Sequence, residues 1–518
     1  MTHTLLRRLS AAVAVAAVGA LAATTVTAPM ASATPADDYL AAQRGDFIDV
    51  RIGDLLPTQP SLGYDEVLYK LGRYNLGKDA TNKKFADWCE ASGLLDVATV
   101  EPGARLDQPA SFSCALTPGN ETKESADLAK SVVIGPGGKL YLTDGHHTLT
   151  AFAETPDGGL RLHVRLRVLG NLSGLSEPAF WNRMIQNRWT WLRDPSGASV
   201  TPSQLPTSVG LANFADDKYR SLLYFARDIG YAQGTLPFQE FYWGAWLRDS
   251  KPIDLSGWNQ TDFDSYLATV KALTERQVAL ADDEVLDSGF TAAQLGKFAQ
   301  WNNGKAADKG EFDKLSKPYS DSKPGKLGYM LEYKNGPRAP FAPSVPRAEI
   351  SGSKLSISWG VPAASAAAVT TYRVLLSRQG GSSTVREVSG ARTSVVFAGL
   401  RAGRYTATVV ARNAVGNSQR SAVSNQVVVR PVITPAKPTI TGNPKVNGVL
   451  KAKPGAWRPA GVKLSYQWLR NGKSIKRATT SSYRITWTDK GKRIAVKVTG
   501  KLKGAASISK TSESKKVR

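Results

Sequence analysis

The spacing of hydrophobic residues divides the chain into two unlike stretches. Up to about residue 300, apolar positions recur at every second residue, as in 162–168, and also at every third or fourth residue, as in 222–226. These two periods predict a domain that mixes strands with helices. From about residue 343 onward only short alternating segments remain, separated by turn-forming residues. That pattern is typical of all-β domains, so we expect an α/β domain followed by two β-sandwiches.

The first β-sandwich is expected over residues 343–431. The segment Leu-Ser-Ile-Ser-Trp at 355–359 alternates apolar and polar residues, and similar strands follow it. Together with Trp359, Leu400 and Tyr405 in that order, these strands resemble a fibronectin type III domain. The resemblance implies that Trp359 lies in the core and that Tyr405 belongs to the tyrosine corner of the fold.

The second β-sandwich is expected over residues 437–518. A strand at 464–470 is followed directly by Asn471-Gly472, the strongest short signal for a β-hairpin. This segment resembles the immunoglobulin-like repeats that are appended to secreted bacterial enzymes. The resemblance implies that Trp468 is the core tryptophan of the domain.

The stretch before the sandwiches divides into three parts. We expect an α/β domain over 45–170 and a helical extension of the same domain over 171–300. Residues 301–342 are rich in Lys, Gly, Pro, Ser and Asp, as in Lys-Pro-Gly-Lys at 323–326. That composition predicts an irregular linker.

The N-terminus has the pattern of a secretory signal peptide. Arg7 and Arg8 precede an apolar run at 11–23, and Ala31-Ser32-Ala33 fits a small-x-small cleavage site. We therefore expect residues 1–33 to be removed and the mature protein to be secreted, either extracellular or associated with the cell wall. No later run of about 18 apolar residues appears, so the mature chain is expected to have no membrane span.

Export gives the two cysteines a meaning. Cys89 and Cys114 are the only cysteines of the chain, which excludes a dense disulfide scaffold and a Cys-rich zinc module. In an oxidising compartment they are expected to pair as a disulfide. The alternative, a nucleophilic thiol, needs a nearby base, and neither cysteine adjoins a histidine in the sequence.

Charge is distributed unevenly along the chain. The net charge is +24, yet residues 34–337 hold 32 basic and 39 acidic residues, whereas residues 437–518 hold 21 basic and two acidic residues. Residues 338–436 hold 12 basic and two acidic residues, so the positive charge belongs to the two rear domains, above all the last one, and not to the α/β domain. The partner it suggests is a polyanion, either an anionic cell-wall polymer or extracellular DNA. A merely solubilising surface is the alternative, and charge alone does not choose between them.

The strongest chemical motif lies at 132–152. Two expected strands flank a Gly-rich turn, and Asp144-Gly145-His146-His147 then opens an expected helix. A helix that starts this way presents backbone N–H groups and the positive end of its dipole, which suits a phosphate. Imidazoles at that place can transfer protons near neutral pH. The structural alternative is a plain turn in which Asp144 caps the helix and one histidine is packed.

Motifs on both sides of this box come in the order of a known family. They are Leu-Leu-Pro-Thr-Gln-Pro at 55–60, Gly-Tyr-Asp-Glu-Val at 63–67 with Lys70, Asp-Lys-Tyr-Arg-Ser-Leu at 217–222 and Phe-Gln-Glu-Phe-Tyr-Trp at 238–243. Together they resemble the ParB/sulfiredoxin superfamily over about residues 45–275, and most closely its secreted, nuclease-like ParB branch. The resemblance implies a small α/β domain that binds phosphate and acts on a phosphate-containing substrate or nucleic acid.

The same resemblance implies roles for single residues. Asp144, His146 and His147 are the implied catalytic or phosphate-positioning groups, and Gly145, Thr148 and Lys70 the implied phosphate-binding groups. His146 falls where sulfiredoxins carry their catalytic cysteine, which excludes sulfiredoxin chemistry here. Thr148 falls where relatives carry an arginine, which removes a bidentate phosphate clamp.

No cofactor is identified, and a divalent metal is not indicated. Adjacent histidines rarely point the same way, although Glu240 or Asp144 could complete a metal site in space. Two function hypotheses follow. The first is a secreted phosphate-ester hydrolase, either a nuclease or a nucleotide hydrolase, tethered to polyanions by its basic sandwich. The second is a non-catalytic extracellular binding or adhesion protein of the cell surface.

Overall fold

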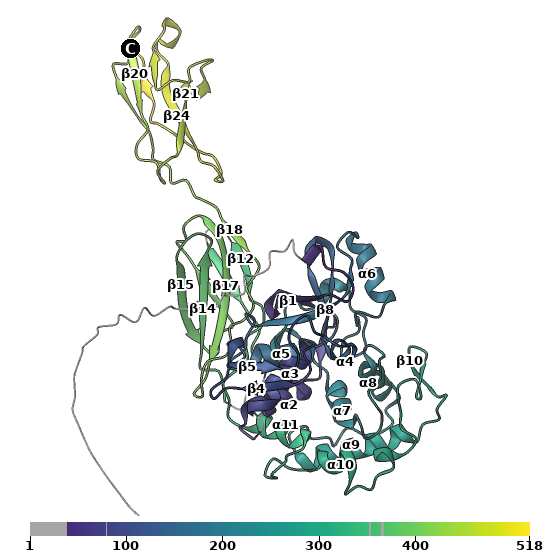
Figure 1. The fold of residues 1–518 in the computed structure, drawn as a ribbon. Coiled ribbons are helices and arrows are strands. Elements are labelled where there is room, and N and C mark those ends of the chain that lie inside the picture. The colour runs from purple at the N-terminus through teal and green to yellow at the C-terminus, as the bar shows by residue number, and fades with distance from the viewer. Residues whose placement is uncertain (1–38, 79, 352–353, 364–366) are drawn as a thin grey trace, which may run out of the picture.

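The computed structural model describes residues 39–78, 80–351, 354–363 and 367–518. The expected signal peptide lies outside the described residues. Figure 1 shows three bodies in sequence: an α/β domain in purple to teal, a green sandwich beside it, and a yellow sandwich beyond that one. No helix of the described residues has the length and apolarity needed to cross a bilayer. The expected fold class, an α/β domain followed by β-sandwiches, is confirmed.

A mixed five-stranded sheet forms the centre of the α/β domain. Its order is β1-β8-β6-β7-β2, with β6 parallel to β8 and β2 parallel to β7. Along β8, Val164, Leu166 and Val168 are fully buried, and the residues between them are not, as the alternating sequence predicts. The strands are β1 (Phe47–Arg51), β2 (Leu55–Pro57), β6 (Ser131–Ile134), β7 (Leu140–Leu142) and β8 (His163–Asn171).

Helices pack around this sheet and against one another. Those before residue 160 are α2 (Tyr64–Asn75), α3 (Ala80–Ala91), α4 (Lys123–Leu128) and α5 (His146–Glu154). Those that follow are α6 (Glu177–Gln186), α7 (Lys218–Ala226), α8 (Gln239–Ser250) and α9 (Phe263–Val278). Three short strand pairs complete the domain: β3 (Ser61–Leu62) with β9 (Ala215–Asp216), β4 (Val97–Val100) with β5 (Phe112–Cys114), and β10 (Val285–Asp287) with β11 (Phe290–Thr291).

The expected irregular linker at 301–342 is wrong. The segment contains α10 (Gly310–Leu315) and α11 (Lys326–Asn335), and Leu327 and Met330 are fully buried in the core of the α/β domain. Helix α11 packs against α2 at Gly72, where a Cβ atom would lie 2.6 Å from the carbonyl oxygen of Tyr329. The Pro residues lie in the turns around these helices, whereas several Lys and Gly residues lie within them, and the helices bury only short apolar faces.

The first sandwich has the expected core. Trp359 and Tyr405 are buried, and the Tyr405 hydroxyl donates a hydrogen bond to the Arg401 carbonyl at 2.7 Å, as a tyrosine corner does. Leu400 packs against the same core. One sheet contains β12 (Arg347–Ser351), β13 (Lys354–Ser358) and β16 (Ser394–Phe397); the other contains β15 (Ser383–Ser389), β14 (Thr371–Arg378), β17 (Gly403–Arg412) and β18 (Val427–Val429).

The first sandwich makes polar contacts with the α/β domain. The Gln419 amide nitrogen donates to the carbonyl oxygens of Thr155 at 2.9 Å and Pro156 at 3.0 Å. The Asn413 amide nitrogen donates to the Arg338 carbonyl at 2.8 Å. These hydrogen bonds join the sandwich to the backbone of two segments of the α/β domain, the turn after α5 and the residues after α11.

The second sandwich surrounds Trp468, which is fully buried, as expected. Asn471 and Gly472 take positive φ values of 46° and 79°, and they join β21 to β22 in the predicted hairpin. Its immunoglobulin-like character stays a prediction. The strands are β19 (Thr439–Gly442), β20 (Val449–Lys453), β21 (Lys463–Arg470), β22 (Lys473–Ser474), β23 (Ser482–Arg484), β24 (Arg493–Lys501), β25 (Ile508–Thr511) and β26 (Lys515–Lys516).

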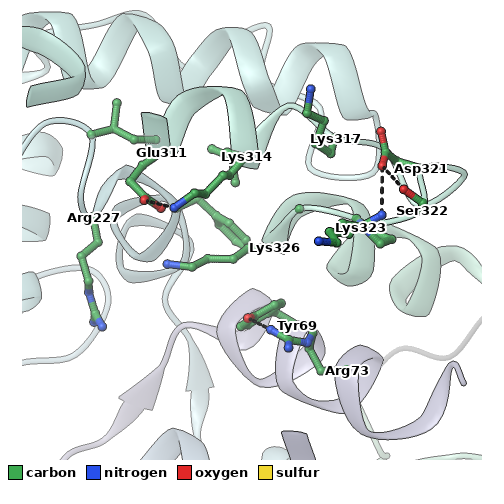
Figure 2. A pocket seen from close by; sticks show the side chains of 15 residues that line it. Tyr69, Arg73, Arg227, Glu311, Lys314, Lys317, Asp321, Ser322, Lys323 and Lys326 are labelled. Atoms are coloured by element: carbon green, nitrogen blue, oxygen red, sulfur yellow. Dashed lines mark hydrogen bonds and ion pairs between the residues drawn. The ribbon is translucent and has the colours of Figure 1, made fainter. Parts of the chain in front are cut away.

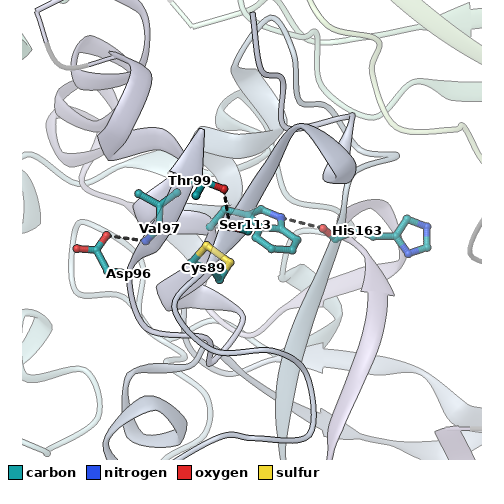
Figure 3. Close-up of a disulfide and its surroundings, with 8 residues drawn as sticks. Cys89, Asp96, Val97, Thr99, Ser113 and His163 are labelled. Atoms are coloured by element: carbon teal, nitrogen blue, oxygen red, sulfur yellow. Dashed lines mark hydrogen bonds between the residues drawn. A yellow bond between two sulfur atoms is a disulfide. The ribbon is translucent and has the colours of Figure 1, made fainter. Parts of the chain in front are cut away.

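The expected disulfide between Cys89 and Cys114 is confirmed. It joins α3 to β5, with 5.6 Å between the two Cα atoms. Figure 3 shows it beside the β4–β5 pair, which the hydroxyls of Thr99 and Ser113 also link at 2.6 Å. The disulfide thus holds an edge hairpin against the helical layer of the domain.

Removal of this disulfide is expected to destabilise the α/β domain. The bridge spans 25 residues, and closing a loop of that size stabilises a fold by about 3 kcal/mol in the chain-entropy model. The double variant Cys89→Ala/Cys114→Ala should lose about that free energy of unfolding in urea titrations. A reducing agent should lower the wild-type value to that of the variant and leave the variant unchanged. A variant as stable as the oxidised wild type would contradict the prediction.

Candidate functional site

The motif at 132–152 folds as the sequence predicts. Strands β6 and β7 flank the Gly-rich turn, and α5 begins at His146 directly after Gly145. Gly145 has φ 95°, and a Cβ atom there would lie 2.7 Å from the Lys130 side chain. A residue other than glycine would therefore be strained at this turn, both by its conformation and by lack of space.

His146 is buried at the start of α5. Only 3% of the residue is exposed, and its Nε2 accepts a hydrogen bond from the Thr58 backbone N–H at 3.1 Å. Burial, opposed by the nearby Asp144 carboxylate, lowers the pKa of His146 to about 4. The ring is therefore neutral near pH 7, and its Nε2 lone pair already holds the backbone after β2.

His147, the next residue of α5, binds the other end of the same loop. Its Nε2 accepts a hydrogen bond from the Gly63 backbone N–H at 3.1 Å and lies 3.7 Å from the Glu66 carboxylate. Burial, followed by the positive charge of Arg220, holds the pKa of His147 well below its usual value. The two imidazoles thus act as acceptors for the backbone at both ends of residues 58–63.

The other residues of the expected site are distributed between the surface and the core. The Asp144 side chain is 61% exposed and pairs with Lys130 at 3.3 Å. Gly145 and Thr148 are buried. The structure therefore does not bring Asp144 to the hydrogen-bonded nitrogens of the histidines, and the phosphate-binding roles of Gly145 and Thr148 stay predictions.

Lys70 is committed to an ion pair. Its ammonium group lies 3.2 Å from the Asp87 carboxylate, which also pairs with Lys83 and accepts a hydrogen bond from the Tyr74 hydroxyl. Burial raises the pKa of Asp87, but the charges of Lys70 and Lys83 outweigh this effect and hold the pKa well below its usual value. Lys70 therefore balances a buried carboxylate beside the site.

Four charged residues from α2, from α7 and its C-terminal end, and from α8 meet next to His147. We call them the ionic cluster: Glu66, Arg220, Arg227 and Glu240. The Arg220 Nη2 lies 2.9 Å from the Glu66 carboxylate and 3.9 Å from the Glu240 carboxylate. Arg227 pairs with Glu240 from the other side. Burial raises the pKa of Glu240, but Arg227 and Arg220 outweigh it and hold that pKa below its usual value.

The donors of the ionic cluster are incompletely paired. Arg220 is 5% exposed, yet within the described part of the chain its Nε and Nη1 have no hydrogen-bond partner. The Arg227 Nε is in the same state. A buried charged donor without an acceptor costs about 1–3 kcal/mol or more, so a molecule that supplies the missing acceptor is bound favourably at such a group.

The sequence contained a signal for this cluster that motif reading missed. Glu66, Arg220 and Glu240 all lie inside the segments that resemble the family, but only Glu240 was considered for a site. Each is a charged residue that stands next to a run of apolar residues in its helix, or is separated from that run by one residue. A charge on the buried side of a helix is uncommon unless it is paired, and this observation could have identified the three residues.

A basic cleft adjoins the ionic cluster through Arg227. The cleft has a volume of about 630 Å³ and lies between α2, the end of α7 and residues 311–326. Figure 2 shows Lys326 and the Glu311–Lys314 pair on one wall and Tyr69 and Arg73 below them. Its charged lining residues are Arg73, Arg227, Lys314, Lys317, Lys323 and Lys326, with Glu311 and Asp321.

Among the residues that the structure describes, no three His, Cys, Asp or Glu side chains are grouped so that they could hold a metal ion together. Glu66, His147 and Glu240 lie near one another, but Arg220 stands between the carboxylates and pairs with them.

Comparisons with known proteins assign the first two domains. Residues 48–249 match the family described as "Putative ParB-like nuclease", and residues 339–427 match the fibronectin type III domain. The matched segment therefore includes the His pair and all four members of the ionic cluster. No curated protein matches the chain.

Solved structures resemble parts of the chain. Protein Atu1540 from Agrobacterium tumefaciens is 23% identical, with 48% of this chain and 98% of that chain covered and a TM-score of 0.32. The FN1–FN3 domains of chicken CNTN1 are 14% identical, with 34% and 66% covered and a TM-score of 0.21. Domains A168–A170 of titin are 20% identical, with 18% and 33% covered and a TM-score of 0.16.

Replacement of His146 is expected to change stability in a pH-dependent way. His146→Ala removes a buried ring and leaves the Thr58 N–H unpaired, which should cost about 2–4 kcal/mol. His146→Gln keeps an acceptor and should retain most of that free energy. Because the unfolded ring takes up a proton below about pH 6.5 and the folded ring only near pH 4, wild-type stability should fall as the pH falls through this window.

The measurement is the difference in unfolding free energy between the wild type and His146→Gln at several pH values. Glu154, whose pKa burial raises to about 7, titrates equally in both proteins and cancels. At 1.36 kcal/mol per pH unit, the wild type should lose up to about 3 kcal/mol relative to the variant between pH 7 and pH 4, so the variant should be the more stable protein at pH 4. An advantage that does not depend on pH would contradict the neutral, buried state of the ring.

Proposed function

We propose that this chain, which carries a ParB-like domain at residues 48–249 and a fibronectin type III domain at 339–427, is a secreted phosphate-ester hydrolase. A nuclease or a nucleotide hydrolase fits the description of the family. One observation carries the proposal. Residues from separate family motifs converge on the ionic cluster, where Arg220 holds two donor nitrogens without acceptors.

The geometry suits hydrolysis in the following way. The free Nη1 or Nε of Arg220 would donate a hydrogen bond to one oxygen of the phosphoryl group, while Nη2 stays paired with Glu66. A water molecule would attack phosphorus while the P–O ester bond breaks, and Glu66 would accept the proton of that water. Glu66 lies 2.9 Å from Arg220, so the base and the phosphate clamp are adjacent.

The remaining charged groups would set the geometry of the clamp. Glu240 lies 3.9 Å from the same Nη2 of Arg220 that pairs with Glu66, and Arg227 pairs with Glu240 in turn. His147, neutral and 3.7 Å from Glu66, is the member of the histidine pair that touches the cluster. In this proposal His146 is a positioning residue, because its contact is with the Thr58 backbone.

Secretion is part of the proposal. The pattern of residues 1–33 is that of a signal peptide, and the Cys89–Cys114 disulfide is of the kind that persists in oxidising compartments. An extracellular or wall-associated location would place the hydrolase next to phosphate polymers and nucleic acid outside the cell.

Arg220→Lys is expected to lower hydrolysis of bis-p-nitrophenyl phosphate strongly. The ammonium keeps the charge but cannot pair with Glu66 and donate to the phosphoryl group in the fixed planar geometry of a guanidinium, so kcat/KM should fall by about a hundredfold or more. Release of p-nitrophenol measures this, and thermal unfolding checks that the variant is folded. Arg183→Lys on the exposed face of α6 is the matched control and should keep wild-type activity. Unchanged turnover in folded Arg220→Lys would remove the proposed clamp.

A second candidate function is adhesion to polyanions through the last domain. Its two acidic residues are both paired: Asp489 is fully buried beside Arg470, and Glu513 pairs with Lys437. The exposed charge of the domain is therefore almost entirely positive. Such a surface attracts anionic polymers through release of their counterions.

One face of this domain concentrates the charge. In the sheet of β21, β24 and β25, Lys463 lies directly opposite Lys501, and Lys497 lies on the same outer face. Like charges placed opposite each other on neighbouring strands destabilise a sheet. A bound polyanion would neutralise this repulsion, which favours adhesion as a function over a merely soluble surface.

Neutralising this face is expected to weaken binding of double-stranded DNA. The variant Lys463→Gln/Lys497→Gln/Lys501→Gln should bind less tightly and show a shallower dependence of log K on log salt, by up to about three times 0.9. The control Lys445→Gln/Lys451→Gln/Lys453→Gln removes equal charge from the other side of the domain and should change the slope less. Equal effects in both variants would show that only net charge matters.

A further inference from the structure

We infer that the basic cleft binds a small phosphorylated molecule with an apolar body. The cleft is built largely by residues 311–326, which lie outside the ParB-like segment 48–249. The inference therefore goes beyond the proposed function, because it assigns a ligand to a part of the chain that the family does not include. It does not require that the bound molecule be hydrolysed.

The charges of the cleft are unbalanced toward positive. Six basic and two acidic residues line it, and the two acids have local partners. Glu311 pairs with Lys314 at 2.6 Å, and Asp321 accepts a hydrogen bond from the Lys323 backbone N–H at 2.9 Å. Among the basic residues, Lys317 pairs with Asp313 at 2.9 Å and Arg227 pairs with Glu240, so Lys323 and Lys326 are the lining cations that a negatively charged ligand would neutralise.

Lys326 is the cation whose position is hardest to explain without a ligand. It is the first residue of α11, where the helix dipole is positive, and the first turn, read from the sequence, contains no Asp or Glu. The carboxylate of Asp228 lies 3.8 Å from its ammonium group. Burial, opposed by Asp228, lowers the pKa of Lys326, as expected for a cation with too little negative charge nearby.

The cleft also offers apolar contact. Phe225, Ile229, Leu315 and Pro324 contribute to its lining beside the charged groups. Its volume of about 630 Å³ falls in the range of sites for small organic molecules, about 300–1,000 Å³. An inorganic anion would leave most of this space unfilled, so the fitting ligand joins a phosphate group to an apolar or aromatic body.

The cleft and the ionic cluster share Arg227. Its guanidinium pairs with Glu240 and lines the cleft, and its Nε has no hydrogen-bond partner among the described residues. A phosphate group in the cleft would therefore lie within reach of the cluster. This connection gives the ligand a route to the proposed catalytic groups without making its binding depend on them.

The test is calorimetric titration of the full chain with three probes. Phenylphosphonate carries both features and has a C–P bond that a phosphate-ester hydrolase does not cleave; inorganic phosphate carries only the charge, and phenol only the ring. We expect phenylphosphonate to bind at least about tenfold more tightly than either of the other two. Absence of phenylphosphonate binding, or equal binding of inorganic phosphate, would overturn the inference.

Three variants locate the site. Lys323→Gln, at an exposed position, and Lys326→Gln should each weaken phenylphosphonate binding by about tenfold, whereas Lys309→Gln, exposed and outside the cleft, should not. Unchanged affinity in both cleft variants overturns the inference. Wild-type binding without any hydrolysis of phosphate esters would leave the inference intact and count against the proposed function. If the variants at Lys323 and Lys326 bind phenylphosphonate as tightly as the wild type and still hydrolyse phosphate esters, the inference is overturned and the proposed function is left intact.

Discussion

The α/β domain depends on the burial of opposite charges between helices that are distant in sequence. Glu66 on α2 and Glu240 on α8 share the guanidinium of Arg220 on α7, and Arg227 completes the set. A charge removed from water is tolerated only next to an opposite charge with good geometry. The positions of these three helices are therefore coupled, and none can shift without leaving a buried charge unpaired.

The histidine pair extends this coupling to the central sheet. His146 and His147 begin α5, and their Nε2 atoms accept the backbone N–H groups of Thr58 and Gly63. The loop after β2 is thereby held against the helix start, and α2 begins directly after it with Glu66 in its first turn. The histidines, which looked like acids and bases in the sequence, set the position of a carboxylate of the cluster.

Local patterns predicted the elements and the cores well. The alternation of β8 and the strand–turn–helix at Gly145 follow from short-range spacing. The core roles of Trp359 and Trp468 follow from the resemblance to known sandwich domains, and the disulfide follows from the expected export. Helix α11 did not follow, because its buried apolar residues, such as Leu327 and Met330, lie between Lys, Gly and Pro residues that dominate the composition.

The ionic cluster could not be predicted for a different reason. Residues 66 and 220 are 154 positions apart, and no local period states that their side chains meet. The hydrogen bonding of the histidines is likewise tertiary, because the donors lie on a loop more than 80 residues upstream. Motif order indicated the right segments, but the choice of residues within them depended on which side of each helix faces the core.

Residues 301–342 have three structural roles that their composition did not predict. Helix α11 completes the core of the α/β domain, the residues from α10 to Lys326 form a wall of the basic cleft, and the end of α11 leads into the first sandwich. Glu154 accepts the backbone N–H groups of Leu211 and Ala342, which ties that exit to the helix that starts with the histidine pair. Because one segment serves core, cleft and connection, a ligand in the cleft would act on the same helix that positions the sandwich.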